Sequence, residues 1–333
     1  MSRNAVGRPI TNERRTRCAR APRVTVRASL LLTDVMRTAA ELSPTSPIVV
    51  LDSGLGGLTV ARALRAALPY DDLLYFGDTA RLPYGSKSPA TITGFVHQII
   101  TYLLPRNPKH VVVACNTATA VALPAIRAAF PHVSISGVIE PGARAAVVAA
   151  GAKKTPIIGI IATEATIRSK AYEKSIHRRR HHARLLLRPT PLLVPLIEEG
   201  RRDDDPLVVL AVEQYLRPFL QRGLDVLVLG CTHYPLLKPL IERTVGISVR
   251  VIDSAERCAE DVARRLQTAG LLRGQGGGTG SLRCFVTDDP PRFERLATRF
   301  LGFEIDSPTW VSTDQLHALL DGHMPQQVLR PAV

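Results

Sequence analysis

The chain has 333 residues, and its 43 lysines and arginines against 29 acids give a formal charge of +14. Hydrophobic residues make up 45% of it, which is ordinary for a globular protein. This composition excludes a chain that is disordered throughout, a collagen-like fibre and a disulfide-stapled miniprotein. The excess of positive charge raises the hypothesis of binding to nucleic acid or to an anionic membrane.

The positive charge is concentrated in two segments. Residues 1–45 carry nine arginines and three acids, and residues 168–188 carry eight basic residues and one acid. Together they account for +13, so the remaining 267 residues are nearly neutral. Tyr172 is the one aromatic residue in either segment, so neither shows the stacking platforms typical of single-strand binding.

Targeting signals are weak. No apolar run reaches the length of about 18 residues that a membrane span requires, so we expect none. The arginine-rich N-terminus resembles an organellar transit peptide. We interpret it as a disordered basic extension over 1–45, or as sequence that precedes a true start at Met36. Five cysteines without CxxC or zinc spacing favour a reducing cytoplasm over a disulfide framework.

The first half of the predicted globular region alternates short strands with helices. A β-branched run over 48–51 predicts a buried strand, which ends in the turn-forming sequence 52–57. Further strands are predicted at 73–76, 110–114 and 133–138. Helices are predicted at 58–68, at 88–104, from the third strand to about 130, and at 143–150.

The second half continues this alternation. Strands are predicted at 156–161, 185–187, 226–229, 249–252 and 283–286. Helices are predicted from the strand end at 161 to about 181, at 205–221 and at 255–269, and 274–280 is a glycine-rich loop. The pattern predicts an α/β protein with doubly wound, mainly parallel sheets, in which ligands bind beyond the carboxyl ends of the strands.

Chemically reactive residues follow several of these strands. They are Asp52-Ser53, Asp78, Cys115-Asn116-Thr117, Thr163 and Cys231-Thr232-His233. Two of the five cysteines thus share one local position, after a strand and at the start of a helix. Free N–H groups and the helix dipole favour a thiolate there. For each cysteine this leaves two alternatives open, catalysis or inert packing.

Other motifs are less specific. The stretch 53–59 is no phosphate-binding loop, because no Gly-Lys-Ser/Thr closes it. His177, His181 and His182 lie in an arginine run, which is typical of a solvated face and not of a metal site. Asp78 has no assigned catalytic role, and Cys18, Cys258 and Cys284 are expected to be non-catalytic.

A set of stretches spread between residues 47 and 310 is more telling in combination. They are 52–60, 78–79, 83–85, 115–120, 161–172, 193–200, 230–235 and 252–255. In this order they closely resemble the glutamate racemases, of the aspartate/glutamate racemase superfamily. The two cysteine motifs are the specific ones, whereas Asp-Ser-Gly alone would be weak.

The resemblance implies a cofactor-independent, metal-free isomerase that interconverts L- and D-glutamate. The product D-glutamate would serve peptidoglycan synthesis, and so cell-wall biogenesis and cell shape. Cys115 and Cys231 would be the acid/base catalysts, the former acting on D-glutamate and the latter on L-glutamate. Asp52 would assist Cys115, and Glu198 and His233 would assist Cys231. Substrate contacts are implied for Asp52, Ser53, Tyr84, Gly85, Asn116, Thr117, Thr232 and His233.

The chemistry agrees with these residue types. Racemisation removes a proton from one face of Cα and returns one to the other, so two facing catalysts are needed, one as thiolate and one as thiol. Asp52 and Glu198 would either shuttle protons or bind the substrate ammonium, and the sequence leaves this open. Hydrogen-bond donors at the strand ends would hold the carboxylates and the developing enolate charge.

The resemblance also implies two α/β domains with the active site between them. The first would be discontinuous, 46–137 plus 254–333, and the second would be 138–253. We expect a cytoplasmic homodimer whose small-molecule partner is glutamate, without membrane contact. The alternatives are a racemase for aspartate or another amino acid, and a contact of the basic segments with nucleic acid or DNA gyrase, which does not exclude the racemase.

Overall fold

The computed structural model describes residues 42–319. Its first sheet has six strands in the order β10-β9-β2-β1-β3-β4, and every neighbouring pair is parallel. The apolar runs that predicted strands form its buried centre. The strands are β1 (Ile48–Asp52), β2 (Leu73–Gly77), β3 (His110–Val113), β4 (Ile135–Gly137), β9 (Leu282–Val286) and β10 (Thr309–Trp310).

Helices cover both faces of this sheet, because alternate residues of each strand point to opposite sides. Ile48 and Val50 pack with α2 (Leu58–Ala67), α12 (Ser254–Thr268) and α13 (Pro290–Leu301). Val49 and Leu51 pack on the other side. The helices there are α3 (Pro89–Leu103), α4 (Asn116–Val121), α5 (Leu123–Ala129) and α14 (Thr313–Ala318).

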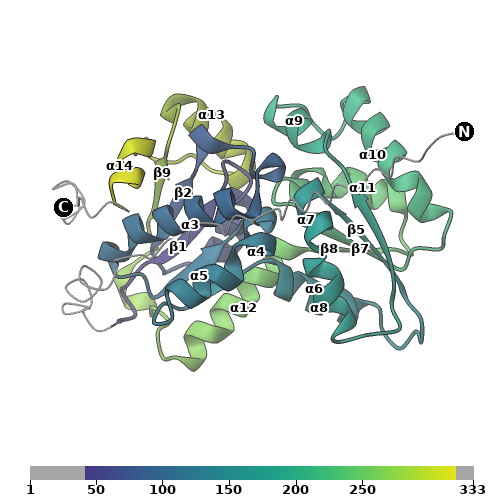
Figure 1. Ribbon diagram of the computed structural model, residues 1–333, viewed down its shortest axis with the longest axis horizontal. Coiled ribbons are helices and arrows are strands. Elements are labelled where there is room, and N and C mark those ends of the chain that lie inside the picture. Colours follow the sequence, from purple (N-terminus) through teal and green to yellow (C-terminus); the bar gives the residue numbers. More distant parts are fainter. Residues whose placement is uncertain (1–41, 320–333) are drawn as a thin grey trace, which may run out of the picture. The chain divides into compact units, whose positions relative to one another are not determined.

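The second sheet has four parallel strands in the order β6-β5-β7-β8. They are β5 (Ile157–Ala162), β6 (Arg184–Pro189), β7 (Val226–Gly230) and β8 (Arg250–Asp253). One face packs on α6 (Ile139–Ala149) and α8 (Ala171–His177), and the other on α9 (Leu193–Glu198), α10 (Pro206–Leu220) and α11 (Lys238–Val245). Figure 1 shows α9, α10 and α11 together beside this sheet.

The strand order places the candidate residues at special positions. In each sheet the chain starts at an inner strand, moves to one side and then crosses to the other. The crossing falls between β1 and β3 in the first sheet and between β5 and β7 in the second. Open α/β sheets bind ligands at such a point. Asp52 ends β1, Cys115 follows β3, and Cys231 follows β7, so the three lie at the two crossing points.

The predicted fold class, α/β with mainly parallel sheets, is confirmed. The sequence missed β10, α9, α11, α13 and α14, which are short or polar. The predicted helix from 161 to about 181 is wrong as a single helix. It breaks at Lys170, whose φ of 58° is left-handed, and continues as α8 to His177. The helix predicted at 143–150 begins at Ile139, since Pro141 is tolerated in a first turn.

The two sheets fall on either side of the predicted domain boundaries at 137 and 254. All described residues nevertheless belong to one compact unit, and one hydrophobic cluster contains side chains from both sheets. The division into two domains therefore stays a prediction. The predicted extension over 1–45, with Cys18 and Met36, lies almost wholly outside the described residues. Within 42–319, no helix is both long and apolar enough to cross a bilayer.

Candidate active site

Cys115 and Asp52 form one half of the candidate site. Cys115 is the N-cap residue of α4, as the sequence predicted, and it is only 6% exposed. Asp52 is 1% exposed, and its Oδ2 accepts a hydrogen bond of 3.0 Å from the Gly54 N–H. The neighbouring strands β1 and β3 thus bring a carboxylate and a thiol, 63 residues apart in the chain, to the same sheet edge.

The electrostatics of Cys115 differ from the expectation of a thiolate. Burial raises the pKa of its thiol to about 12, and the negative charge of Asp52 adds to this. Hydrogen bonds from the Ala118 N–H and the Ser53 hydroxyl act in the opposite direction without outweighing burial. The prediction that this helix start favours a thiolate is therefore wrong for the ligand-free protein, because desolvation outweighs the few N–H groups of a six-residue helix.

Cys231, His233 and Glu198 form the other half. The Nδ1 of His233 lies 3.8 Å from the Sγ of Cys231, and its Nε2 lies 3.0 Å from Oε1 of Glu198. Burial alone would lower the pKa of His233, but its hydrogen bonds to Cys231 and Glu198 raise the pKa to about 10. The imidazole is therefore charged at neutral pH, and it presents Nδ1 to the sulfur of Cys231.

The local structure at Cys231 is less regular than at Cys115. The sequence placed both cysteines directly at a helix start. Cys231 is instead followed by a turn, and a 3₁₀ helix over Tyr234–Leu237 precedes α11. Pro235, the second residue of this 3₁₀ helix, has no N–H to donate to the carbonyl of Cys231, as an α-helix beginning there would require. The group beside the Sγ of Cys231 is thus the His233 imidazole, and not a helix N-terminus.

The two halves meet. The Thr59 hydroxyl on α2 donates a 2.9 Å hydrogen bond to the Thr232 carbonyl. A Cβ on Gly56 would lie 2.2 Å from the Thr232 hydroxyl and 2.5 Å from Nδ1 of His233, so only glycine lets the two loops approach this closely. The charges interact as well, since His233 and Glu198 both affect the pKa of Asp52, which burial raises.

The amide of Asn116 is fixed on one side only. Its Oδ1 accepts a 2.8 Å hydrogen bond from the Tyr172 hydroxyl. The adjacent Thr117 hydroxyl lies 2.9 Å from that of Thr163, which follows β5. The second sheet thus contributes side chains that hold the start of α4. Tyr172 lies inside a stretch that carries the family resemblance, but the sequence assigned it no function.

Tyr84 and Gly85 form the loop that approaches from β2. The Tyr84 hydroxyl donates a hydrogen bond to the buried carboxylate of Asp78, which also binds Arg81 and the Thr287 hydroxyl. The Tyr84 hydroxyl is thus engaged within the protein. A Cβ on Gly85 would lie 3.4 Å from the Cβ of Thr163, which places this loop beside the second sheet. Asp78, to which sequence analysis assigned no catalytic role, anchors the loop.

Two buried polar atoms at the centre of the site have no hydrogen-bond partner: Oδ1 of Asp52 and Nδ2 of Asn116. Buried polar groups are normally satisfied, and leaving one unpaired costs about 1–3 kcal/mol. One of these atoms accepts and the other donates. A ligand with both a cationic donor and an anionic acceptor would satisfy them, and an amino-acid zwitterion has both groups.

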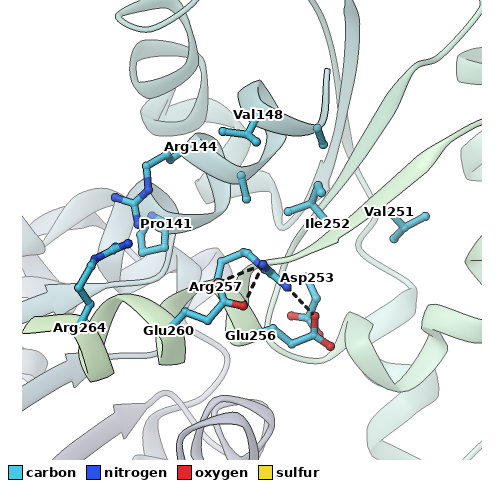
Figure 2. A pocket seen from close by; sticks show the side chains of 12 residues that line it. Pro141, Arg144, Val148, Val251, Ile252, Asp253, Glu256, Arg257, Glu260 and Arg264 are labelled. Carbon is cyan, nitrogen blue, oxygen red and sulfur yellow. Dashed lines mark hydrogen bonds and ion pairs between the residues drawn. The ribbon is translucent and has the colours of Figure 1, made fainter. Parts of the chain in front are cut away.

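Residues 42–319 hold no group of three His, Cys, Asp or Glu side chains that could bind a metal ion. A surface hollow of about 410 Å³ lies elsewhere on the protein. Figure 2 shows the side chains of α6, β8 and α12 that line it. There Arg257 pairs with Glu256 and Glu260. None of the predicted site residues lines this hollow.

The second basic segment, 168–188, covers the end of α7 (Glu164–Ser169), all of α8 and β6 up to Arg188. Arg178 and Arg179 both pair with Glu140, and Arg180 donates to the carbonyls of Gly151 and Lys153. These three arginines of the segment are therefore engaged by a carboxylate or by backbone carbonyls of the protein itself. Contact of this segment with nucleic acid or gyrase remains a prediction.

The structure is thus an α/β protein with buried cysteines at the crossing points of two parallel sheets, one near the Asp52 carboxylate and the other beside the His233 imidazole. Residues 58–262 match the model of the Asp/Glu/hydantoin racemase family. The glutamate racemase of Geobacter metallireducens is 45% identical over 271 residues, which cover 81% of this chain and 98% of that protein.

Solved structures agree. A glutamate racemase isoform of Bacillus anthracis superposes with a TM-score of 0.75 at 39% identity, covering 80% of this chain and 98% of that one. The glutamate racemase of Francisella tularensis in complex with D-glutamate gives a TM-score of 0.74 at 34% identity, covering 84% and 100%. The chain therefore belongs to the Asp/Glu/hydantoin racemase family and, within it, to the glutamate racemases, which are isomerases.

Proposed function

We propose that this protein interconverts L- and D-glutamate with Cys115 and Cys231 as its two acid/base catalysts. The observation that carries the proposal is the pair of unpartnered buried atoms, Oδ1 of Asp52 and Nδ2 of Asn116, at strand ends that also carry the two buried thiols. The bound D-glutamate named for the Francisella relative supports glutamate as the substrate.

Substrate binding follows from the donors and acceptors present. Asp52 accepts a hydrogen bond from the substrate ammonium, and Nδ2 of Asn116 donates to a carboxylate. The hydroxyls of Ser53, Thr117 and Thr232 and the backbone of the Tyr84-Gly85 loop supply further donors. Donors that are already in place when negative charge develops on the enolate lower the barrier most effectively.

The proton transfers follow from the two environments. In the L-to-D direction the Cys231 thiolate, beside the His233 imidazolium, takes the proton from Cα. The electron pair of that C–H bond passes into the α-carboxylate as an enediolate. Cys115, which burial keeps as a thiol, gives its proton to the opposite face. The D-to-L direction reverses both steps, and Glu198 keeps His233 charged throughout.

The proposed enzyme needs neither pyridoxal phosphate nor metal, because its proton transfers use protein groups alone. By resemblance, its D-glutamate serves peptidoglycan synthesis in the cytoplasm, and the enzyme acts as a homodimer. Because both cysteines are nearly inaccessible in this structure, substrate entry requires the residues around them to separate.

The test is a racemisation assay by circular dichroism on the purified protein without added pyridoxal phosphate. We expect turnover of both glutamate enantiomers and little turnover of aspartate. Cys115→Ala and Cys231→Ala should each abolish it, whereas Cys284→Ala, which removes a buried thiol from β9, should retain it. Full activity in either of the first two variants, or faster turnover of aspartate than of glutamate, would overturn the proposal.

A further inference from the structure

Tyr172 is a buried polar residue that the mechanism above does not use. It lies on α8, is 2% exposed, and its hydroxyl donates the 2.8 Å hydrogen bond to Oδ1 of Asn116. A Cβ on Gly230 would lie 3.2 Å from Cε2 of its ring, and one on Gly142 would lie 3.5 Å from its hydroxyl oxygen. Its ring is therefore held between β7 and α6.

A tyrosine hydroxyl can donate or accept, and in the structure that of Tyr172 donates to Oδ1 of Asn116, which corresponds to one presentation of the amide. A side-chain amide has a carbonyl oxygen and an NH₂ group that differ little in shape, and a half-turn about the last bond exchanges them. Because the tyrosine hydroxyl occupies the oxygen, Nδ2 is the end left unpartnered. In the opposite orientation, the NH₂ would face the tyrosine and the amide oxygen would face an anionic carboxylate.

The tyrosine suits this purpose chemically. Burial raises the pKa of Tyr172 above its ordinary value, so its hydroxyl remains protonated and able to donate at any pH at which the enzyme works. Packing alone does not require the hydroxyl, since phenylalanine would fill the same apolar space among Ala143, Ile176 and Val228. Packing therefore accounts for the ring of Tyr172 but not for its hydroxyl group.

We propose that Tyr172 is a positioning residue that fixes the Asn116 amide with its NH₂ toward the substrate carboxylate. The proposal rests on the proposed function, in which Nδ2 of Asn116 binds that carboxylate. Tyr172 itself does not touch the substrate in this account. It acts only through Asn116, and this distinguishes it from a residue that merely stabilises the fold.

The test is a double-mutant cycle. Tyr172→Phe removes only the hydroxyl, and the loss of one hydrogen bond predicts a fall in kcat/KM of about 10-fold, mainly through a higher KM. Asn116→Ala should reduce kcat/KM further. The decisive comparison is Tyr172→Phe in the Asn116→Ala background, where we expect no additional loss. Tyr102→Phe is the matched control, since its hydroxyl meets Arg106 away from the site and its removal should leave kcat/KM unchanged.

The outcomes separate the two proposals. If the wild type racemises glutamate and Asn116→Ala is impaired, but Tyr172→Phe matches the wild type or costs the same factor in both backgrounds, the positioning proposal is wrong. If Asn116→Ala is as active as the wild type, the binding role of Asn116 fails and the inference falls with it. Thermal unfolding of each variant establishes that it is folded.

A second variant keeps the test decisive if Tyr172→Phe does not fold. Asn116→Asp retains an oxygen for the tyrosine hydroxyl but has no NH₂ group to offer. We expect kcat/KM to fall by about 100-fold or more, because a carboxylate would face the substrate carboxylate. Activity equal to that of the wild type would overturn the proposal without any change at Tyr172.

Discussion

The substitution Glu198→Gln isolates the charge that acts on His233. Glutamine keeps an oxygen for Nε2 of the imidazole, so the 3.0 Å hydrogen bond is preserved while the negative charge is removed. The pKa of His233 should therefore fall from about 10, because the burial that lowers it remains while the charge of Glu198 is lost and only the contact with Cys231 still raises it. At pH 8 a smaller fraction of the variant's imidazole would then be charged.

The magnitude follows from the pKa itself. A rise from about 6.5 to about 10 corresponds to about 5 kcal/mol of preference for the charged form, shared between the contacts with Glu198 and Cys231. In the variant, less of the His233 imidazole would be charged beside Cys231, and we expect kcat/KM to fall by about 100-fold at pH 8. Both directions must lose the same factor, because free L- and D-glutamate have equal free energies.

The assay is the pH dependence of initial rates between about pH 6 and 10.5, from both enantiomers. The wild type should lose activity as the pH passes about 10, and in Glu198→Gln this decline should move to lower pH. Glu199→Gln is the matched control, since that exposed carboxylate pairs only with Arg201. An unchanged alkaline limb in Glu198→Gln would refute the assignment of Glu198 to His233.

Protein stability must show the same linkage. Because the pKa of His233 is raised in the folded protein, its charged form stabilises the fold fully below about pH 6.5, and this contribution is lost as the pH rises through about 10. Urea unfolding should thus show wild type and Glu198→Gln converging at high pH. A difference between them that stays constant with pH would contradict a charged His233.

Three further substitutions test other parts of the account. Asp52→Asn should lower the pKa of Cys115, because the negative charge of Asp52 adds to the effect of burial in raising it. The measurement is the rate of alkylation of Cys115 near neutral pH, which should increase. Gly56→Ala should reduce kcat at least 10-fold with little change in KM. The added Cβ would lie 2.2 Å from the Thr232 hydroxyl, so the loop that carries Cys231 would have to shift. Lys109→Met should destabilise the protein by about 3–5 kcal/mol in urea unfolding, because it leaves a buried aspartate unpaired.

Much of the fold was predictable from short apolar runs. Buried parallel strands are near-continuous stretches of Val, Ile and Leu, so 48–51 and 226–229 identified β1 and β7 without tertiary information. The missed helices lacked such a signal. For example, α13 has apolar side chains separated by charged ones, and it joins the core at Phe293, Ala297, Phe300 and Leu301.

The candidate site was predictable residue by residue but not as an arrangement. The strand-end position singled out Cys115 and Cys231, and resemblance added Glu198, which lies on a helix that the sequence did not predict. The raised pKa of Cys115 was not predicted, because the burial that causes it depends on side chains distant in sequence. Tyr172 was missed for the same reason, since its contact with Asn116 spans 56 residues.

The central claim is that two cysteines act on opposite faces of Cα, and racemisation in D₂O tests it most directly. Starting from unlabelled L-glutamate, the first D-glutamate formed should carry deuterium at Cα, delivered from Cys115, while the L-glutamate recovered at the same time keeps its protium. Proton and mass spectra of the separated enantiomers give both values. Transfer of protium into the product, or deuterium entering recovered L-glutamate as fast as product forms, would show that one group serves both faces and would contradict the account.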